Sequence, residues 1–204
     1  MTTLAASWNT AWKDLALPPP AGLFDALCAA WSGPQRRYHT LQHLRECLAH
    51  FERERARARH AGEVALALWF HDAVYDLHRP DNEAASADWA RQALHAAGAT
   101  EDAAARVHAL VMATCHHRAP AAGDEALLVD IDLAILGADR ARFAEYERQI
   151  REEYGFVPEP VFRAKRREVL RGFEVRTPIY ATPGLRARLE GAAHANLARA
   201  LSSP

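Results

Sequence analysis

Uniform helical periodicity is the feature that most constrains how this chain can fold. Apolar residues recur three and four positions apart along almost the whole sequence, in which alanine, leucine, arginine and glutamate dominate. Valine, isoleucine and threonine do not alternate with polar residues as they do in a β-strand. Segments rich in proline, glycine or N-capping side chains divide the periodicity into about eight to ten helices. The sequence therefore predicts an all-α fold.

The length of the chain fits one domain. A chain of 204 residues buries roughly two thirds to three quarters of its unfolded surface around a single core. We therefore expect one helical bundle over residues 1–204, on which residues 1–33 pack as a helical extension. Trp8 and Trp12 mark one face of a short helix in this extension. This face packs either on the chain's own core or on a second copy, so a homodimer is one alternative.

Composition and charge argue against several classes of protein. With a formal net charge of -1 and 25% charged residues, the chain is neither a strongly cationic binder of nucleic-acid polymers nor a disordered tail. Its longest strongly apolar stretch, residues 64–70, is far shorter than the roughly 20 residues of a membrane span, and the N-terminus lacks the features of a secretory signal. We expect a cytoplasmic protein with no membrane partner. Cys28, Cys47 and Cys115 are interpreted as small buried apolar residues, because their spacing indicates neither disulfides nor a thiolate zinc site.

A predicted helix from residue 38 to about residue 57 carries an unusual set of histidines. Its leucines and a phenylalanine recur at helical spacing and form the stripe that faces the core. His39, His43 and His50 lie on a separate stripe, more than about 90° away on a helical projection. A histidine at the margin of an apolar stripe faces a cavity more readily than one inside the stripe, so His39 and His43 are candidate ligands.

A second predicted helix, residues 64–73, is apolar on all sides until it reaches His71 and Asp72. A helix that is apolar all round is buried in the core of the protein. An imidazole and a carboxylate at the end of a buried helix need polar partners or a bound cation there. This pair is therefore the second candidate site.

Histidines and aspartates gather in four short motifs of the sequence. Two imidazoles and two carboxylates give a mixed nitrogen and oxygen donor set, which suits Mn, Fe, Co, Ni or Zn better than calcium. Each motif taken alone is a weak signal. The candidates are His39 and His43 in YHTLQH, His71 and Asp72 in WFHDAVYD, His116 and His117 in ATCHHR, and Asp130 and Asp132 in LLVDIDLAIL.

The order of these motifs carries a resemblance to a known family. The chain reads R-x-Y-H-x-L-x-H at residues 36–43, W-F-H-D-A-V-Y-D at 69–76, N-E-x-x-S-A at 82–87 and D-x-D-L-A-I-L-G at 130–137. In this combination it resembles a small bacterial branch of the HD superfamily of metal-dependent phosphohydrolases. The resemblance extends over about residues 36–201. It implies an all-α, single-domain HD-type helical bundle that holds a metal ion.

The resemblance also implies a set of ligands, namely His43, His71, Asp72 and Asp132. The ion would be a divalent cation such as Mn, Mg, Co, Ni, Fe or Zn. Asp132 is preferred to Asp130 because the last aspartate of the superfamily usually precedes a leucine-containing helix. If this stretch is helical, the two carboxylates point about 200° apart and do not both bind one ion. The choice between these two aspartates stays open at this point.

Hydrolysis of a phosphoester is the activity that the resemblance implies, with a small-molecule phosphoester or nucleotide as substrate. A divalent ion lowers the pKa of a bound water and polarises a phosphoryl oxygen. His39, expected one helical turn from His43, would protonate the leaving group, since an imidazole titrates near neutral pH. Asp72 would also orient or deprotonate the water. Arg36 and His117 are expected to contact the substrate.

Two other functions remain open at the level of the sequence. A di-iron oxygenase with this fold would need further ligands, for which His116, His117 and Glu83 are the candidates. A sensor or scaffold would keep the fold without turnover. The complete ligand set argues against the scaffold, because buried polar groups without a partner destabilise a protein.

Overall fold

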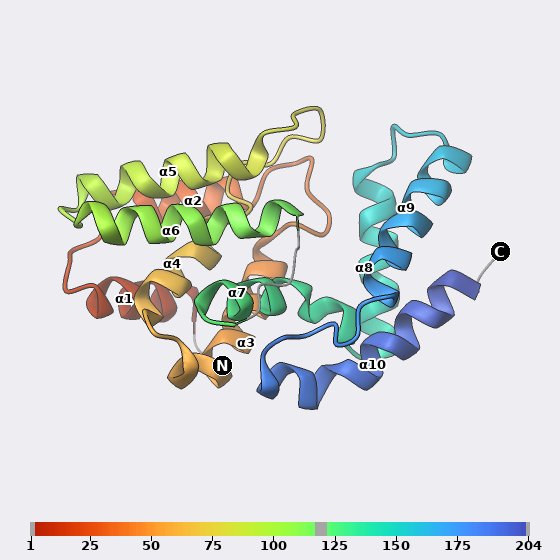
Figure 1. Ribbon diagram of the computed structural model, residues 1–204. Helices are drawn as coiled ribbons and strands as arrows, with labels where there is room; N and C mark the ends of the chain where they lie inside the picture. Colours follow the sequence, from red (N-terminus) through yellow and green to blue (C-terminus); the bar gives the residue numbers. More distant parts are fainter. Residues whose placement is uncertain (1–2, 117–121, 203–204) are drawn as a thin grey trace.

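A computed structural model describes residues 3–116 and 122–202 of the chain (Figure 1). These residues form ten α-helices and three short 3-10 helices and contain no strand, which confirms the predicted all-α fold. No helix in these two ranges has the length and apolar character needed to cross a membrane. The α-helices are α1 (Leu4–Asp14), α2 (Leu23–Ala30), α3 (Leu41–Glu54), α4 (Ala61–Phe70), α5 (Asn82–Ala96), α6 (Glu101–Ala113), α7 (Asp124–Asp132), α8 (Arg140–Glu153), α9 (Glu159–Glu174) and α10 (Pro183–Ser202).

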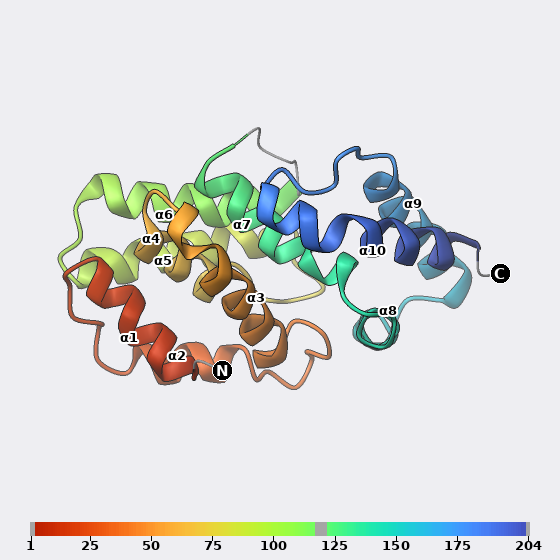
Figure 2. The ribbon, with the colours of Figure 1, turned by 90° about the horizontal axis from the view of Figure 1, so that it is seen from below.

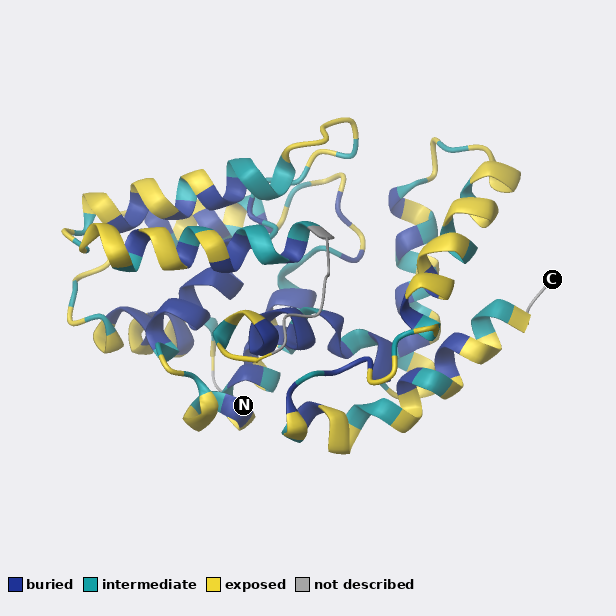
Figure 3. Ribbon diagram, viewed as in Figure 1, coloured by how far each residue is buried: buried dark blue, intermediate teal, exposed yellow. Residues whose placement is uncertain are grey.

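Helix α4 lies at the centre of the fold. Its residues 64–70 are at most 1% exposed, because α1, α3, α5, α6 and α7 all pack against it. Figure 3 shows α4 buried, whereas the outer faces of α5 and α6 are exposed. The predicted burial of this apolar segment is confirmed. The helix ends at Phe70, however, and His71 caps it, so both polar residues of the motif lie at its C-terminal end.

The aromatic face of α1 packs on this core. Trp8 and Trp12 are 3% and 1% exposed, and the ring centroid of Trp8 lies 5.1 Å from that of Trp69 in α4. Thr3 caps the helix through a hydrogen bond from the backbone N–H of Ala6. Of the two alternatives for this face, the structure therefore shows packing on the chain's own core.

Helix α3 begins later than the sequence predicts. Thr40 is its N-cap, and the first helical residue is Leu41. His39 therefore precedes the helix, and the prediction that it shares a helical stripe with His43, one turn away, is wrong. Of the predicted apolar stripe of the same helix, Leu44, Leu48 and Phe51 are buried, and Leu41 in its first turn is partly exposed.

Helices α8, α9 and α10 join the rest of the fold through the 3-10 helix Leu133–Gly137, which directly follows α7. Both α8 and α10 contact this short segment, and α10 also contacts α9. Figure 2 shows α10 running from the body formed by α1–α7 past α8 and α9. A Cβ atom at Gly137 would lie 2.6 Å from Leu189 Cβ, so only glycine allows this close approach. The contacts that position the three C-terminal helices are therefore made by the 3-10 helix that directly follows Asp132.

Candidate metal centre

Four polar side chains from three parts of the chain converge at the C-terminal end of α4. His43 lies in α3, His71 and Asp72 follow α4, and Asp132 ends α7. The Nε2 atom of His43 lies 3.2 Å from His71 Nε2 and 3.1 Å from Asp132 Oδ1. Asp72 Oδ2 lies 3.2 Å from His71 Nε2 and 3.9 Å from His43 Nε2. The structure therefore brings together all four residues of the predicted ligand set.

The pKa values of the two imidazoles of this centre shift in opposite directions. His43 and His71 are 2% and 1% exposed. Burial lowers the pKa of His43. Burial acts the same way on His71, but the charges of Asp72 and Asp132 outweigh it and raise its pKa to about 9. In the absence of a metal, this raised pKa favours a protonated His71 at neutral pH, and a divalent cation at the centre would displace that proton.

Hydrogen bonding at the far side of the His71 ring fixes which nitrogen faces the centre. Its Nδ1 atom donates to the carbonyl oxygen of Leu68 at 2.8 Å. A metal-ligating histidine typically donates its other ring N–H in this way, which orients the ring and selects the tautomer. Two imidazoles and two carboxylates within this distance fit a first-row divalent ion. The residues present therefore fit the expected metal.

Cys47 belongs to the same group of side chains, which the sequence analysis missed. Its Sγ atom lies 3.7 Å from both ring nitrogens of His43. Together with His71 and Asp132, these residues offer ligand atoms that all lie within 4.8 Å of one another. Burial raises the pKa of the Cys47 thiol well above its usual range. The available signal was its position four residues after His43, which places both on one helix face.

Asp130 binds the backbone that precedes α10 and does not contribute to the candidate metal centre. Its side chain is fully buried and accepts hydrogen bonds from the backbone N–H groups of Ala181, at 3.1 Å, and of Thr182. These residues directly precede α10, so the carboxylate also lies at the positive end of that helix dipole. Asp132, in contrast, faces His43 and His71. Of the two aspartates that the sequence left open, only Asp132 lies with the imidazoles.

We expect Asp130→Ala to destabilise the fold and leave metal binding intact. The substitution removes the acceptor of two buried N–H groups, which costs about 2–4 kcal/mol in the free energy of unfolding. Urea denaturation measures this loss, and metal analysis of the folded variant measures the stoichiometry. A folded variant that has lost its ion would contradict the separate roles of Asp130 and Asp132.

Metal binding should release a proton from His71 at neutral pH. A ligand imidazole must be neutral, whereas the pKa of His71 without metal is about 9. The apparent affinity should therefore rise about tenfold for each pH unit up to about pH 9 and level off above it. Calorimetry in two buffers of different ionisation enthalpy gives the number of protons released. Binding with no proton release at pH 7 would contradict this prediction.

A buried carboxylate on α8, that of Glu153, holds His39 and the residues before it in place. Glu153 Oε1 accepts the backbone N–H groups of Arg37, Tyr38 and His39, at 2.8, 2.8 and 3.0 Å. Its Oε2 atom lies 2.7 Å from His39 Nδ1 and accepts the hydroxyl of Tyr75 at 2.8 Å. The segment before α3 is thus fixed to the end of α8. The sequence gave no signal for this contact, because the two residues lie 114 positions apart.

This arrangement leaves one nitrogen of His39 available to a substrate. Burial tends to raise the pKa of Glu153, but the hydrogen bonds from His39 and from backbone N–H groups lower it to about 2. Because the carboxylate is ionised, it accepts the Nδ1–H of His39 and orients the ring, which leaves Nε2 for a ligand. His39 therefore has the partner that an acid and base catalyst requires.

Arg36 lies behind the site, in a position unlike that expected for a side chain that contacts phosphate. It is 4% exposed, and its guanidinium lies over the rings of Trp31 and Tyr75. Its N–H groups donate to the backbone carbonyls of His39, Asp72 and Ala73, at 2.8, 2.8 and 3.0 Å. The guanidinium therefore connects the segment before α3 to the His71–Asp72 corner.

Three other candidates stand apart from the centre or outside the structure. His117 lies outside the described residues, and of His116 only the backbone is described, as the end of a 3-10 helix. Glu83 begins α5 and lines the cleft described below. Like Asp72, it lies outside the group whose ligand atoms are all within 4.8 Å of one another, but Asp72 lies 3.2 Å from His71 Nε2, and no contact of Glu83 with the centre is found in the described residues. Of these three candidates for the further ligands of an oxygenase, only Glu83 is described in full, and it lies outside the group of possible ligands.

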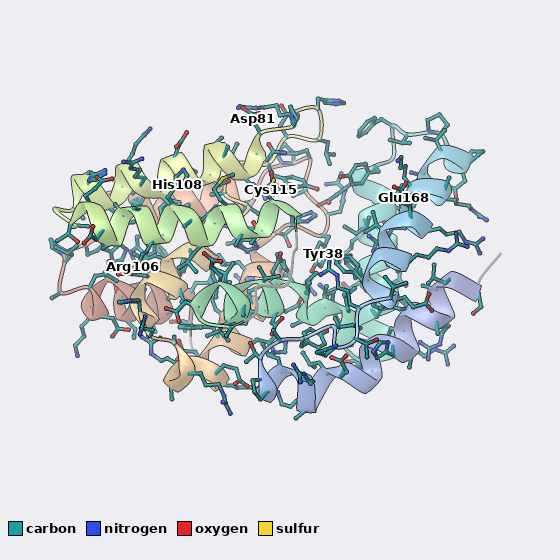
Figure 4. All side chains as sticks on the ribbon, in the orientation of Figure 1. Tyr38, Asp81, Arg106, His108, Cys115 and Glu168 are labelled. Carbon is teal, nitrogen blue, oxygen red and sulfur yellow. The ribbon has the colours of Figure 1, made fainter. Side chains whose placement is uncertain are left out.

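A cleft of about 630 Å³ opens from the centre between the α1–α7 body and helices α8 and α9. Asp72, Asp132 and His39 line one end of it, so a bound molecule can reach them. Tyr38 lines the same end and lies between the body and α8 (Figure 4). Its buried hydroxyl has no hydrogen-bond partner in the structure. A ligand oxygen at this position would supply one.

Comparison with known proteins adds no relative. No protein-family model matches the chain. No curated protein and no solved structure matches it.

Proposed function

We propose that this chain is an HD-type, metal-dependent phosphohydrolase. The observation that carries the proposal is the convergence of His43, His71, Asp72 and Asp132 within hydrogen-bonding distances at one end of a cleft. The order of the motifs along the sequence supports the same conclusion. A divalent ion held by these four side chains would activate a water molecule and polarise a phosphoryl oxygen.

Each side chain around the cleft then has a definite part in hydrolysis. Asp72 orients the attacking water and accepts its proton. Tyr38 donates its free hydroxyl to a phosphoryl oxygen. As the oxygen of water bonds to phosphorus, the ester P–O bond breaks, and His39 passes a proton to the departing alkoxide. The products are an alcohol and phosphate, or a phosphomonoester where the substrate is a diester.

The test is metal analysis of the purified chain, followed by phosphate release from a panel of phosphoesters and nucleotides with Mn, Mg, Co or Ni. Release that requires the metal and disappears in Asp72→Ala is the expected result. Bound iron without release would favour an oxygenase. A folded chain that binds no metal would overturn the proposal and leave a sensor or scaffold.

A further inference from the structure

The charge of the cleft limits what it can bind. Among the described residues, three cationic side chains line it, and each is already paired with a carboxylate: Arg79 with Asp81, Lys165 with Glu168 and Arg166 with Glu147. Four carboxylates line the same cleft, namely Asp72, Asp76, Glu83 and Asp132. A chain of several phosphates would need free cations to neutralise it. This lining therefore favours a substrate with a single phosphoryl group.

Beyond the metal end, the walls of the cleft are largely apolar. Buried side chains of the 3-10 helix Leu133–Gly137 and of α8 form one wall, and α9 presents side chains opposite them. These walls offer mainly hydrocarbon, and their polar groups are the hydroxyls of Tyr146 and Tyr154 and the paired cations of Lys165 and Arg166. A nucleobase would find few groups there that read its edge. The six side chains that define the two walls are Leu133, Leu136, Ile150, Val161, Phe162 and Val169.

Exposed apolar side chains concentrate at this cleft. The described residues include four large hydrophobic side chains that are strongly exposed, of which Val161 (54%) and Val169 (46%) line the cleft. Phe156 (55%) stacks on Tyr154, which also lines it. The fourth, Val175, is 78% exposed and does not line the cleft. Apolar surface that water touches and that continues from a polar centre is typical of a ligand site.

We propose that the substrate is a phosphate ester of an apolar alcohol, whose hydrocarbon chain lies along α9 while its single phosphoryl group reaches the metal centre. This inference rests on the proposed function and names its substrate class. Because each buried methylene contributes about 0.8 kcal/mol, kcat/KM should rise roughly two- to fourfold per methylene until the cleft is filled. Val161 and Val169 are the residues that set this preference.

The experiment measures phosphate release by the metal-loaded chain from ethyl, butyl, hexyl and octyl phosphate and from nucleoside monophosphates. The ratio of kcat/KM for octyl over ethyl phosphate should be large in the native chain and fall at least about fivefold in the double variant Val161→Ser, Val169→Ser. Val175→Ser is the matched control, because it replaces an exposed valine just beyond the C-terminal end of α9 and outside the cleft. It should leave the ratio unchanged.

Binding of octylphosphonate, which is not hydrolysed, gives a second readout. Calorimetry should show tighter binding than for ethylphosphonate and a negative heat-capacity change. Hydrolysis without dependence on chain length, or faster hydrolysis of nucleoside monophosphates, overturns this inference and leaves the proposed function standing. A dimer that the double valine variant dissociates, with no dependence on chain length, would assign the apolar surface to self-association and also overturn it. No hydrolysis of any phosphoester overturns both proposals.

Discussion

Asp72→Ala should lose its metal and with it the activity on phosphoesters. The remaining centre has two imidazoles and one carboxylate, and the charge that holds the pKa of His71 near 9 is reduced. Even a change outside the ligand set commonly costs 10- to 100-fold in metal affinity, so loss of a ligand should cost at least about 100-fold. Loss of the ion would also remove several kcal/mol of transition-state stabilisation and so lower kcat/KM about 10³-fold. Metal analysis and phosphate release measure the two effects.

A neighbouring carboxylate provides the control for this variant. Asp76 lies on the same loop and lines the cleft, but it is exposed and accepts the backbone N–H of His78 at 2.9 Å. Asp76→Ala should therefore keep the ion. An NMR titration of metal-free Asp72→Ala should also show the pKa of His71 falling from about 9. A stoichiometric ion in Asp72→Ala would remove this residue from the ligand set.

Local chemistry made the helices and the candidate polar residues readable from the sequence. The all-round apolar character of residues 64–70 predicted burial, and burial at the end of α4 explains why His71 and Asp72 need partners. The motif order named His43 and Asp132 as those partners. Patterns within a few positions marked these residues as candidates, and the resemblance to a family selected His43 over His39 and Asp132 over Asp130.

Long-range contacts and helix boundaries were beyond the sequence. Because Thr40 is the N-cap of α3, His39 lies before the helix and has different neighbours from those predicted. The partner of His39 is Glu153, whose position depends on how α8 packs against the 3-10 helix after Asp132. Arg36 was expected to contact substrate, and its burial under Tyr75 has no local sequence signature. Such contacts follow from tertiary packing, which periodicity does not encode.

The pairing of His39 with Glu153 leads to the second large expected effect. His39→Ala should keep the metal, because the ring is not among the four ligands, but should lower kcat on alkyl phosphates by about 10²–10⁴. An alkoxide is a poor leaving group and needs the proton. A nitrophenolate leaves without it, so p-nitrophenyl phosphate should lose far less activity. The ratio of the two losses, measured on one enzyme preparation, reports protonation of the leaving group.

Substitution of Glu153 should change the same ratio of activity losses, because Glu153 acts through the ring of His39. In Glu153→Gln an oxygen remains for the three backbone N–H groups, but the negative charge beside the imidazole is gone. Alkyl phosphates should therefore lose more activity than p-nitrophenyl phosphate, as they do in His39→Ala. Tyr75→Phe is the control, because it removes the other hydrogen bond to Glu153 Oε2 and spares the contact with His39. Equal losses on both substrates would mean that this pair shapes the site and transfers no proton.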